Sequence, residues 1–377
     1  MTFDKNYGSS SLIADIETKD VVDRFSLSKQ IIAMKVQPPQ HRRLLEGTEV
    51  FAAEWLTKFH DELYDWEPCD ISCYTVKNIT VSGFGNIWFD QQMLVDPRIM
   101  PLYVRELLDS DLSADASVEN FNRLPVREIT EPCIVCAGHG THVYGHFLIE
   151  MLFRLLVASY ARGPVFSYAK FLLDSNSPSW LLKILSDYFD ITGDRIVFFD
   201  PAVERVLVGN AVLPGRVLRD HFFHPFCVRA INDLKAFMPK SPIPTYQKVF
   251  IVRGAYVNPH APRRIMLNED DIADIATNEF GFKAIKFEAH NWADQISLFD
   301  KARIIVGQAG SSLHGSMFSK PDTIVASIGF MNTVQSEIAA AWDQRLAFLT
   351  HGVNLRSEYS VDHELFRRYI DAVVSHG

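Results

Sequence analysis

Three residues that can move protons or bind anions are spaced four apart in the stretch THVYGHFLIEMLFRLL, residues 141–156: His146, Glu150 and Arg154. This spacing places them on one face of a helix. Either His146 or Glu150 could accept a proton from a hydroxyl, with the other as its orienting group. The alternative is a Glu150–Arg154 surface ion pair, which contributes only roughly a few tenths of a kcal/mol. The apolar residues around the stripe indicate partial burial and favour the chemical role.

A second candidate site is the glycine-containing stretch RIIVGQAGSSLHGSMF, residues 303–318. A buried strand ends there, small residues turn the chain, and a short helix is expected to start near Ser311. Backbone N–H groups at such a helix start can bind an anion, and ligands of open α/β sheets bind at this edge. The alternative is a plain tight turn, because the stretch has neither the Walker spacing nor the full dinucleotide motif.

Arginines are expected to face the same edge. Arg253 ends the predicted strand in FIVRG, and Arg263 and Arg264 follow in the next loop. The planar guanidinium suits a diphosphate because its N–H groups donate in pairs. A solvated loop charge is an equal alternative for Arg263 and a weaker one for Arg253.

The stretch CIVCAGHGTH raises a metal hypothesis, with Cys133, Cys136, His139 and His142 at close intervals. Structural zinc usually joins two separated pairs of ligands. The two cysteines fall in a predicted strand, and side chains three apart on a strand point to opposite faces. The pattern therefore favours the absence of a metal.

The elements that position these residues alternate along the chain. Apolar runs predict strands at 132–138, 170–174, 195–199 and 204–215, and helical patterns predict helices at 141–162, 178–190 and 224–237. The first of these helices is expected to stop at Gly163-Pro164. The alternation predicts βαβ units and a mostly parallel sheet.

The stretch MPKSPIPTYQ, residues 238–247, holds three prolines and predicts a linker, because helix interiors and central strands exclude proline. After it the alternation of strands and helices restarts and predicts a doubly wound α/β lobe. The predicted organisation is an N-terminal lobe at 1–238, a linker at 239–247, a C-terminal lobe at 248–355, and a final helix within 356–377.

The composition narrows the class of protein. The chain has 377 residues, of which 47% are hydrophobic and 22% charged, with a formal charge of −9. An acidic chain argues against nucleic acid as a partner. It contains neither an apolar run long enough to span a membrane nor a signal-peptide pattern at its start, and it has five cysteines. These features predict a cytoplasmic protein.

Three stretches together resemble family 61 glycosyltransferases: YGHFLIEMLFRLL, FIVRGAYVNPHAPRRIMLNEDDI and GFKAIKFEAHNWADQISLFDKARIIVGQAGSSLHGSMFSKP. Their order and spacing match the family over roughly residues 140–325. The sequence departs from the family pattern at four positions, which indicates a divergent branch, and the absence of a signal-peptide pattern and of a membrane span favours a bacterial-type member. Ala309 stands where the turn usually has histidine, Asp294 where it has glutamate, Val252 where it has serine and Val143 where it has asparagine.

The resemblance implies a GT-B fold, in which two Rossmann-like lobes face each other across a cleft with the donor in the second lobe and the acceptor in the first. It also implies inversion of configuration and no required metal or cofactor. The final helix would cross back onto the first lobe. On the acceptor side the resemblance points to Glu150 or His146 as the base, with Arg154 holding the helix face or the acceptor.

On the donor side the resemblance points to ten residues. The departing diphosphate would be bound by Arg253, Arg264 and the amides of Gly310, Ser311 and Ser312. Asn268 and Glu269 match an Asn-Glu motif and either contact the donor or cap the helix that begins there. Glu288 and Gln295 are candidates for sugar or ribose hydroxyls, and His314 is a candidate replacement for the missing turn histidine.

The implied activity is transfer of a sugar from a nucleotide-sugar donor to a hydroxyl of a glycan or glycolipid. The first candidate donor is a UDP-sugar, and the expected process is surface polysaccharide synthesis. The enzyme would work in the cytoplasm, with peripheral contact at the inner face of the plasma membrane as one arrangement. Two rivals stay open: a related sugar-nucleotide epimerase or hydrolase, and a glycan-binding module without catalysis.

Overall fold

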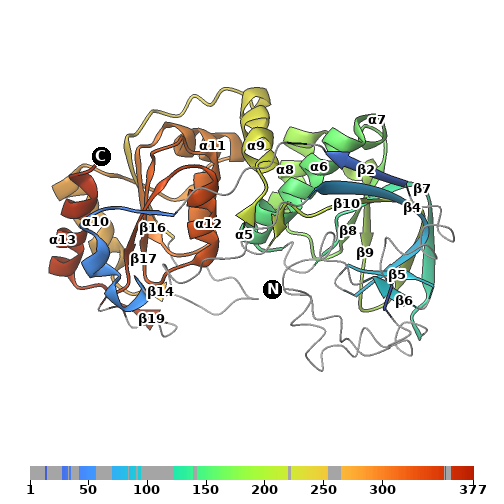
Figure 1. The fold of residues 1–377 in the computed structure, drawn as a ribbon, viewed down its shortest axis with the longest axis horizontal. Helices are drawn as coiled ribbons and strands as arrows, with labels where there is room; N and C mark the ends of the chain where they lie inside the picture. Colours follow the sequence, from blue (N-terminus) through green and yellow to red (C-terminus); the bar gives the residue numbers. More distant parts are fainter. Residues whose placement is uncertain are drawn as a thin grey trace. The chain divides into compact units, whose positions relative to one another are not determined.

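A computed structural model describes residues 13–14, 28–32, 34, 42–56, 70–83, 85–90, 92–94, 123–138, 142–219, 222–253, 265–351, 353 and 358–377. The chain divides into two compact units (Figure 1). The first unit comprises Met1–Val36 and Pro68–Arg219, and the second comprises Gln37–Glu67 and Asp220–Gly377. The chain therefore enters the second unit twice.

The first unit is built on a mixed sheet. Its described strands run in the order β1-β6-β5-β4-β10-β7-β8-β9, with β2 paired to β4. Their bounds are β1 Ile13–Ala14, β2 Ser28–Ile32, β4 Ile71–Ser82, β5 Asn86–Phe89, β6 Gln92–Leu94, β7 Val126–Val135, β8 Lys170–Asp174, β9 Ile196–Phe199 and β10 Arg205–Pro214. Strands β10, β7, β8 and β9 are parallel, whereas β4 is antiparallel to β10, β2 and β5. The predicted parallel pairing is therefore found for β7–β10, the strands on which the prediction was based, and for the short pair β1–β6, whereas β4 adds antiparallel pairs on the other side of β10.

The described helices of the first unit lie between β7 and β9 in the sequence. They are α5 Tyr144–His146, the π-helical turn η4 Phe147–Met151, α6 Leu152–Ala161, α7 Gly163–Phe166, α8 Ser179–Phe189 and the short η5 Gly193–Arg195. The predicted break at Gly163-Pro164 is confirmed, because α6 ends at Ala161 and the proline occupies the start of α7.

The second unit is a doubly wound α/β unit. Its parallel strands lie in the order β15-β13-β16-β17-β18-β3, with bounds Lys283–Ile285, Lys248–Ile251, Ile304–Gln308, Ile324–Ile328, Arg345–Leu349 and Arg43–Leu44. The helices are α9 Phe226–Phe237, α10 Glu269–Phe280, α11 Trp292–Lys301, α12 Thr333–Ala341 and α13 His363–Val374, with the short turns η1 Glu49–Phe51, η2 Ala53–Trp55, η6 Phe287–Ala289 and η7 Leu313–Phe318. A small pair, β14 Ile265–Met266 with β19 Glu358–Tyr359, lies beside them, and β11 Leu218–Arg219 and β12 Phe222–Phe223 precede α9.

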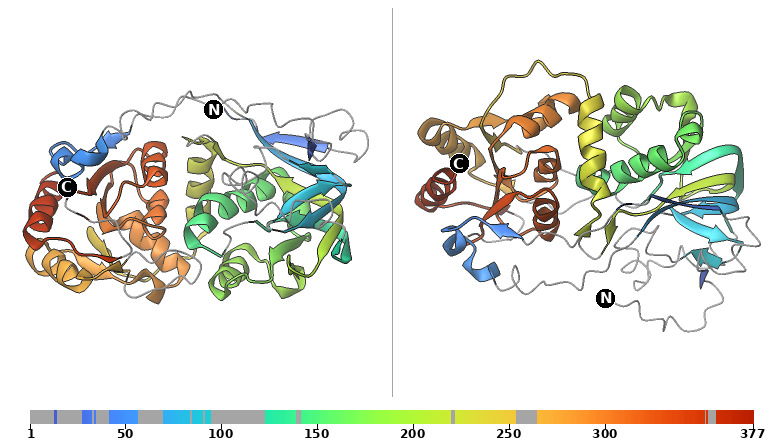
Figure 2. Two further views of the ribbon diagram at one scale, coloured as in Figure 1. Left: turned by 90° about the horizontal axis from the view of Figure 1, so that it is seen from below. Right: turned by 45° about the horizontal axis from the view of Figure 1, so that its top comes forward.

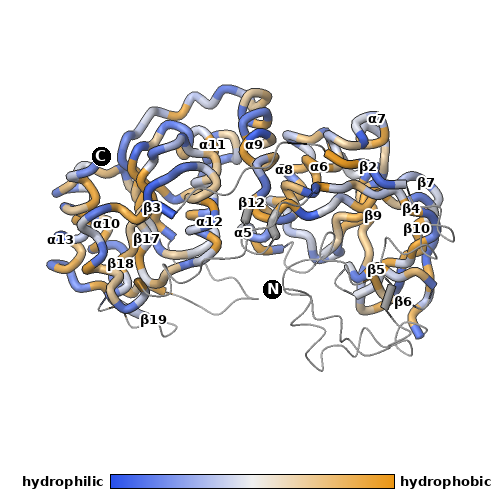
Figure 3. The backbone as a smooth tube through the Cα atoms, viewed as in Figure 1, coloured by the Kyte–Doolittle hydropathy of each residue, from blue (hydrophilic) through white to orange (hydrophobic). Residues whose placement is uncertain are grey.

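Helices cover both faces of this sheet. Helices α10 and α13 lie together on one side of β16 and β17, and α12 lies on the other (Figure 1). Their apolar residues form one core with the strands, and the helices alternate hydrophilic and hydrophobic stretches in Figure 3, as amphipathic helices do. The prediction of a doubly wound second lobe agrees with this arrangement.

Two helices belong to a different part of the chain than predicted. Helix α9, expected in the first lobe, belongs to the second unit, where Lys235 Nζ contacts Asp300 Oδ1 at 2.6 Å and donates to Phe318 O at 3.0 Å. The proline-rich stretch therefore connects two parts of one unit. The final helix α13 does not cross to the first unit, because Phe366, Tyr369 and their apolar neighbours fill the core beside α10.

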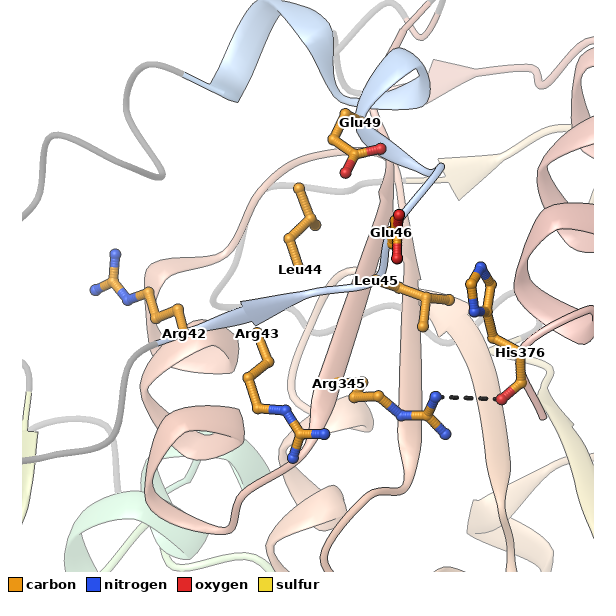
Figure 4. A pocket seen from close by; sticks show the side chains of 8 residues that line it. All are labelled: Arg42, Arg43, Leu44, Leu45, Glu46, Glu49, Arg345 and His376. Atoms are coloured by element: carbon orange, nitrogen blue, oxygen red, sulfur yellow. Dashed lines mark hydrogen bonds between the residues drawn. The ribbon is translucent and has the colours of Figure 1, made fainter.

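The N-terminal segment 42–56 is the unexpected part of the second unit. It lies beside the C-terminal elements (Figure 2), where β3 pairs with β18. Arg43 binds Asp343 at 2.6 Å and Asp322 at 2.7 Å. A cavity of about 490 Å³ lies here, lined by Arg43, Arg345, His376 and neighbours from 42–49 (Figure 4). It is at the amino ends of β3 and β18, whereas the predicted donor residues follow the carboxyl ends of β13 and β16.

Candidate functional site

The helix that carries His146, Glu150 and Arg154 is not continuous. The α-helical turn α5 is followed by the π-helical turn η4, and only from Leu152 does the regular helix α6 run. A π turn accommodates an extra residue, so residues on its two sides do not keep regular α-helical spacing. Such turns are rare in proteins overall, and those that occur are often at functional sites.

Glu150 is the single charged residue of this π turn. Its carboxylate Oε1 lies 3.2 Å from Nδ1 of His146, and the two side chains are 14% and 35% exposed. The other four residues of the turn are buried. The structure thus places a partly exposed imidazole–carboxylate pair on an otherwise apolar turn. Either member can accept a proton, so both predictions for the base stay open.

Arg154 departs from the predicted stripe. Its side chain is 9% exposed and Nη2 donates to the backbone oxygen of Val135 at 2.7 Å, at the last residue of β7. No ion pair joins Arg154 to Glu150, both of which are described, so the alternative of a surface ion pair is wrong. Nη1 lies 3.7 Å from the position that a Cβ on Gly138 would take.

In the second unit the glycine-containing turn follows β16. The turn leads into η7, a six-residue 3₁₀ helix, rather than the α-helix that was expected. Among the described residues, no group accepts a hydrogen bond from the N–H groups of Gly310, Ser311 or Ser312. Because the helix is short, its dipole adds little, and these individual N–H groups are the donors available to an anion.

Arg253 shares this edge with the turn. It follows β13, the neighbour of β16, and its Nη1 lies 3.9 Å from the position that a Cβ on Gly310 would take. The structure therefore brings a guanidinium close to a turn whose three backbone donors belong to half-buried residues. Arg264 and Arg263 lie outside the described residues.

A buried network lies beneath Arg253. Glu269 Oε1 accepts from the backbone N–H of Arg253 at 2.9 Å and from Nε2 of Gln308 at 2.5 Å. The hydroxyl of Tyr359 in turn donates to Gln308 Oε1 at 3.1 Å. These three side chains are only 5–7% exposed. Glu269 thus fixes the chain at Arg253, and its predicted contact with a donor stays a prediction.

The remaining predicted donor residues have mainly internal partners. Asn268 makes no side-chain cap; it pairs through Nδ2 and Oδ1 with the backbone of Val361 at 2.8 and 3.1 Å. Gln295 Nε2 donates to the backbone oxygens of Phe287 and His290 at 2.9 and 3.0 Å, and so holds the turn that carries the exposed Glu288.

His314 is 7% exposed on η7. Its Nε2 lies 3.2 Å from the amide nitrogen of Asn332, which directly precedes α12. Since the amide can only donate, a neutral His314 carries its proton on Nδ1. Asn332, Gln308 and Tyr359 were not predicted; Gln308 stands inside the quoted turn, but nothing in the local sequence marks the other two.

The metal hypothesis gains no ligands in the described part of the chain. Burial raises the pKa of the Cys133 thiol to about 12 and that of Cys136 to about 11, so both thiols are protonated near neutral pH. His139 is outside the described residues, within which no group of three or more possible ligands occurs. Nor is any described helix long and apolar enough to cross a membrane.

Comparison with the sequence models of known families gives a match. The sequence model of the family Glycosyltransferase 61 matches residues 144–326, which begin at α5 and end within β17. No curated protein matches the chain. The matched span contains the His146–Glu150 pair, Arg154, Arg253 and the Gly310 turn. The match supports an assignment to glycosyltransferase family 61, and the family implies glycosyltransferase activity.

Proposed function

We propose that this protein is an inverting, metal-independent glycosyltransferase with a GT-B arrangement of its two units. The observation that carries the proposal is the joint position of Arg253 and the N–H groups of Gly310, Ser311 and Ser312 at the carboxyl edge of a parallel sheet. Three backbone donors and a guanidinium suit the diphosphate of a nucleotide-sugar, with a UDP-sugar as the first candidate.

The proposed reaction divides between the units. The acceptor hydroxyl oxygen attacks the anomeric carbon of the sugar and gives its proton to Glu150 or His146, which contact each other. The bond between the anomeric carbon and the phosphate oxygen breaks, and its electron pair leaves with the nucleoside diphosphate. The guanidinium of Arg253 and the turn amides stabilise this charge as it develops.

The acceptor in this proposal is a glycan or glycolipid hydroxyl of a surface polysaccharide precursor, reached in the cytoplasm at the inner face of the membrane. Transfer to a glycolipid acceptor in vesicles supports this part. Strong transfer to a soluble protein acceptor, with none to a glycolipid, contradicts it.

The test is a thermal-shift screen of nucleoside diphosphates and nucleotide-sugars, first without metal and then with Mg²⁺ or Mn²⁺. A ligand at 100 times its dissociation constant stabilises the fold by about 2.7 kcal/mol, which moves the transition by several degrees. The shift should occur without metal and be lost in Arg253→Gln. The matched control is Arg303→Gln, because Arg303 is exposed and precedes the opposite end of β16.

The same screen separates the rivals. No shift with any nucleotide contradicts the transferase and favours a glycan-binding module. A nucleotide-dependent shift, combined with hydrolysis or epimerisation of the sugar-nucleotide as fast as transfer, favours an epimerase or hydrolase.

A further inference from the structure

The guanidinium of Arg154 is buried with few partners. Nη2 donates to Val135 O, but Nε is buried and meets no acceptor among the described residues. No carboxylate oxygen of the described residues lies within ion-pair distance of it, since the neighbouring acid Glu150 contacts His146 instead. An arginine has five N–H donors, and buried arginines are normally paired with an acid. Arg154 therefore holds a positive charge that the described chain does not balance.

A structural role accounts for only part of this arrangement. One neutral carbonyl needs one donor, which an uncharged amide could supply without the large desolvation cost of a buried charge. The thiol of Cys136 lies near Arg154, but burial holds its pKa at about 11, so it is no counter-ion near neutral pH. The contact with β7 therefore does not account for the charge.

The position of Arg154 matches a ligand site. It contacts the carboxyl end of β7, and Nη1 faces Gly138, where no side chain stands between the guanidinium and the space that a Cβ would fill. Arg154 follows Glu150 by four residues on the same helical segment, which carries both the guanidinium and the His146–Glu150 pair.

We propose that Arg154 and Gly138 form a subsite for an anionic group, a carboxylate or a phosphate, on the sugar acceptor. This inference rests on the proposed function and adds to it that the acceptor is an acidic or phosphorylated sugar. Two guanidinium N–H groups match the two oxygens of either anion. Gly138 keeps the approach open because it has no side chain.

The test uses ligand-observed NMR at constant ionic strength with sodium glucuronate, glucose 6-phosphate, inorganic phosphate and neutral glucose as probes. The key variant is Gly138→Ala, whose methyl group would lie in ordinary contact with Nη1 at 3.7 Å and so should not disturb the fold. The acidic sugars should bind the unmodified protein more tightly than glucose. Their binding should weaken about tenfold in Gly138→Ala, the order expected when a hydrogen bond to a charged group is lost.

Arg154→Gln should abolish the preference for acidic sugars over glucose; if that variant does not fold, the comparison of Gly138→Ala with the unmodified protein decides. Equal binding of glucose and the acidic sugars, or equal binding by both proteins, overturns the inference. Binding of inorganic phosphate as tight as that of glucose 6-phosphate also overturns it, because the sugar then adds nothing. Nucleotide binding, tested with Arg253→Gln, reports separately on the proposed function.

Discussion

The network beneath Arg253 predicts the effect of removing a single hydroxyl, in Tyr359→Phe. The hydroxyl donates to Oε1 of Gln308, a residue that is only 5% exposed. A Cβ on Gly329 would lie 3.2 Å from this hydroxyl, so the surroundings are tight. Phenylalanine fits the same space but leaves Gln308 Oε1 without this donor.

A buried acceptor that loses its donor costs about 1–3 kcal/mol, which is more than the net value of the hydrogen bond itself. The free energy of unfolding of the second unit should therefore fall by about this amount. A smaller loss would indicate that Gln308 turns its amide or that water enters. Because Gln308 also donates to Glu269, the amide cannot turn without breaking that 2.5 Å bond.

The assay is urea unfolding followed by tryptophan fluorescence, to which Trp292 and Trp342 of the second unit contribute together with Trp88 and Trp180 of the first. Where the two units give separate transitions, the transition that moves in Tyr359→Phe is assigned to the second unit. The control is Tyr246→Phe, whose ring lies 5.8 Å from Lys283 Nζ and keeps that contact without its hydroxyl. If Tyr359→Phe and the control unfold at the same urea concentration, the reasoning from the buried network is refuted.

Two further substitutions test single features of the fold. Arg43→Met should lower the free energy of unfolding by only about 0.2–1 kcal/mol per ion pair, because the partners are exposed. Arg43 lowers the pKa of Asp322 in the folded state. This stabilisation is therefore present above about pH 4 and disappears as the pH falls through the pKa of the folded state. The unmodified protein and the variant should accordingly have the same stability at the acid end of their denaturation curves. Gly85→Ala should cost more, about 1–3 kcal/mol or above, since Gly85 has a φ of +91° and the new Cβ would lie 2.5 Å from Ala137 O. Gly163→Ala, with nothing within 4 Å and no positive φ, should leave the melting temperature unchanged or slightly higher, and equal losses in both glycine variants would contradict the steric argument.

The sequence predicted those elements whose local pattern and flanking residues agree. Strand β8 has the predicted bounds 170–174, because an apolar run there is limited by polar residues on both sides. Helix α10 ends at Phe280, directly before Gly281, and this glycine has the left-handed φ of +72° typical of a residue that ends a helix. In both cases the decisive signal is within a few residues of the element.

The elements that the sequence did not predict depend on distant contacts. The π turn was not predictable because the four apolar residues of 147–151 fit helical spacing with or without an inserted residue. Strand β3 has two residues, and its position depends on Arg43 reaching acids about three hundred residues away. The final helix was assigned to the wrong unit since amphipathicity reports that a face is buried but not which surface buries it.

For the candidate site, the sequence indicated the positions of motif residues better than it indicated the groups that their side chains contact. The motif residues Asn268 and Gln295 lie where the family pattern suggests, yet their described side-chain bonds go to backbone groups of 361, 287 and 290. A motif identifies a position that the fold requires, but the atoms that each side chain binds depend on three-dimensional packing. Arg253 and the Gly310 turn were predicted because strand ends meet at one edge of a parallel sheet.

Glu269 and Arg154 are both buried charged residues, but they differ in the hydrogen-bond partners that the protein gives them. Each is a charged residue less than 10% exposed, and each contacts the carboxyl end of a strand. Glu269 accepts bonds from Arg253 and Gln308, so its position is determined by the protein alone. Arg154 has one neutral acceptor and a buried N–H with none in the described chain. Since a buried charge without a counter-ion is unfavourable, Arg154 gains from an anionic ligand whereas Glu269 does not, and substrate specificity on the acceptor side is therefore expected to depend on Arg154.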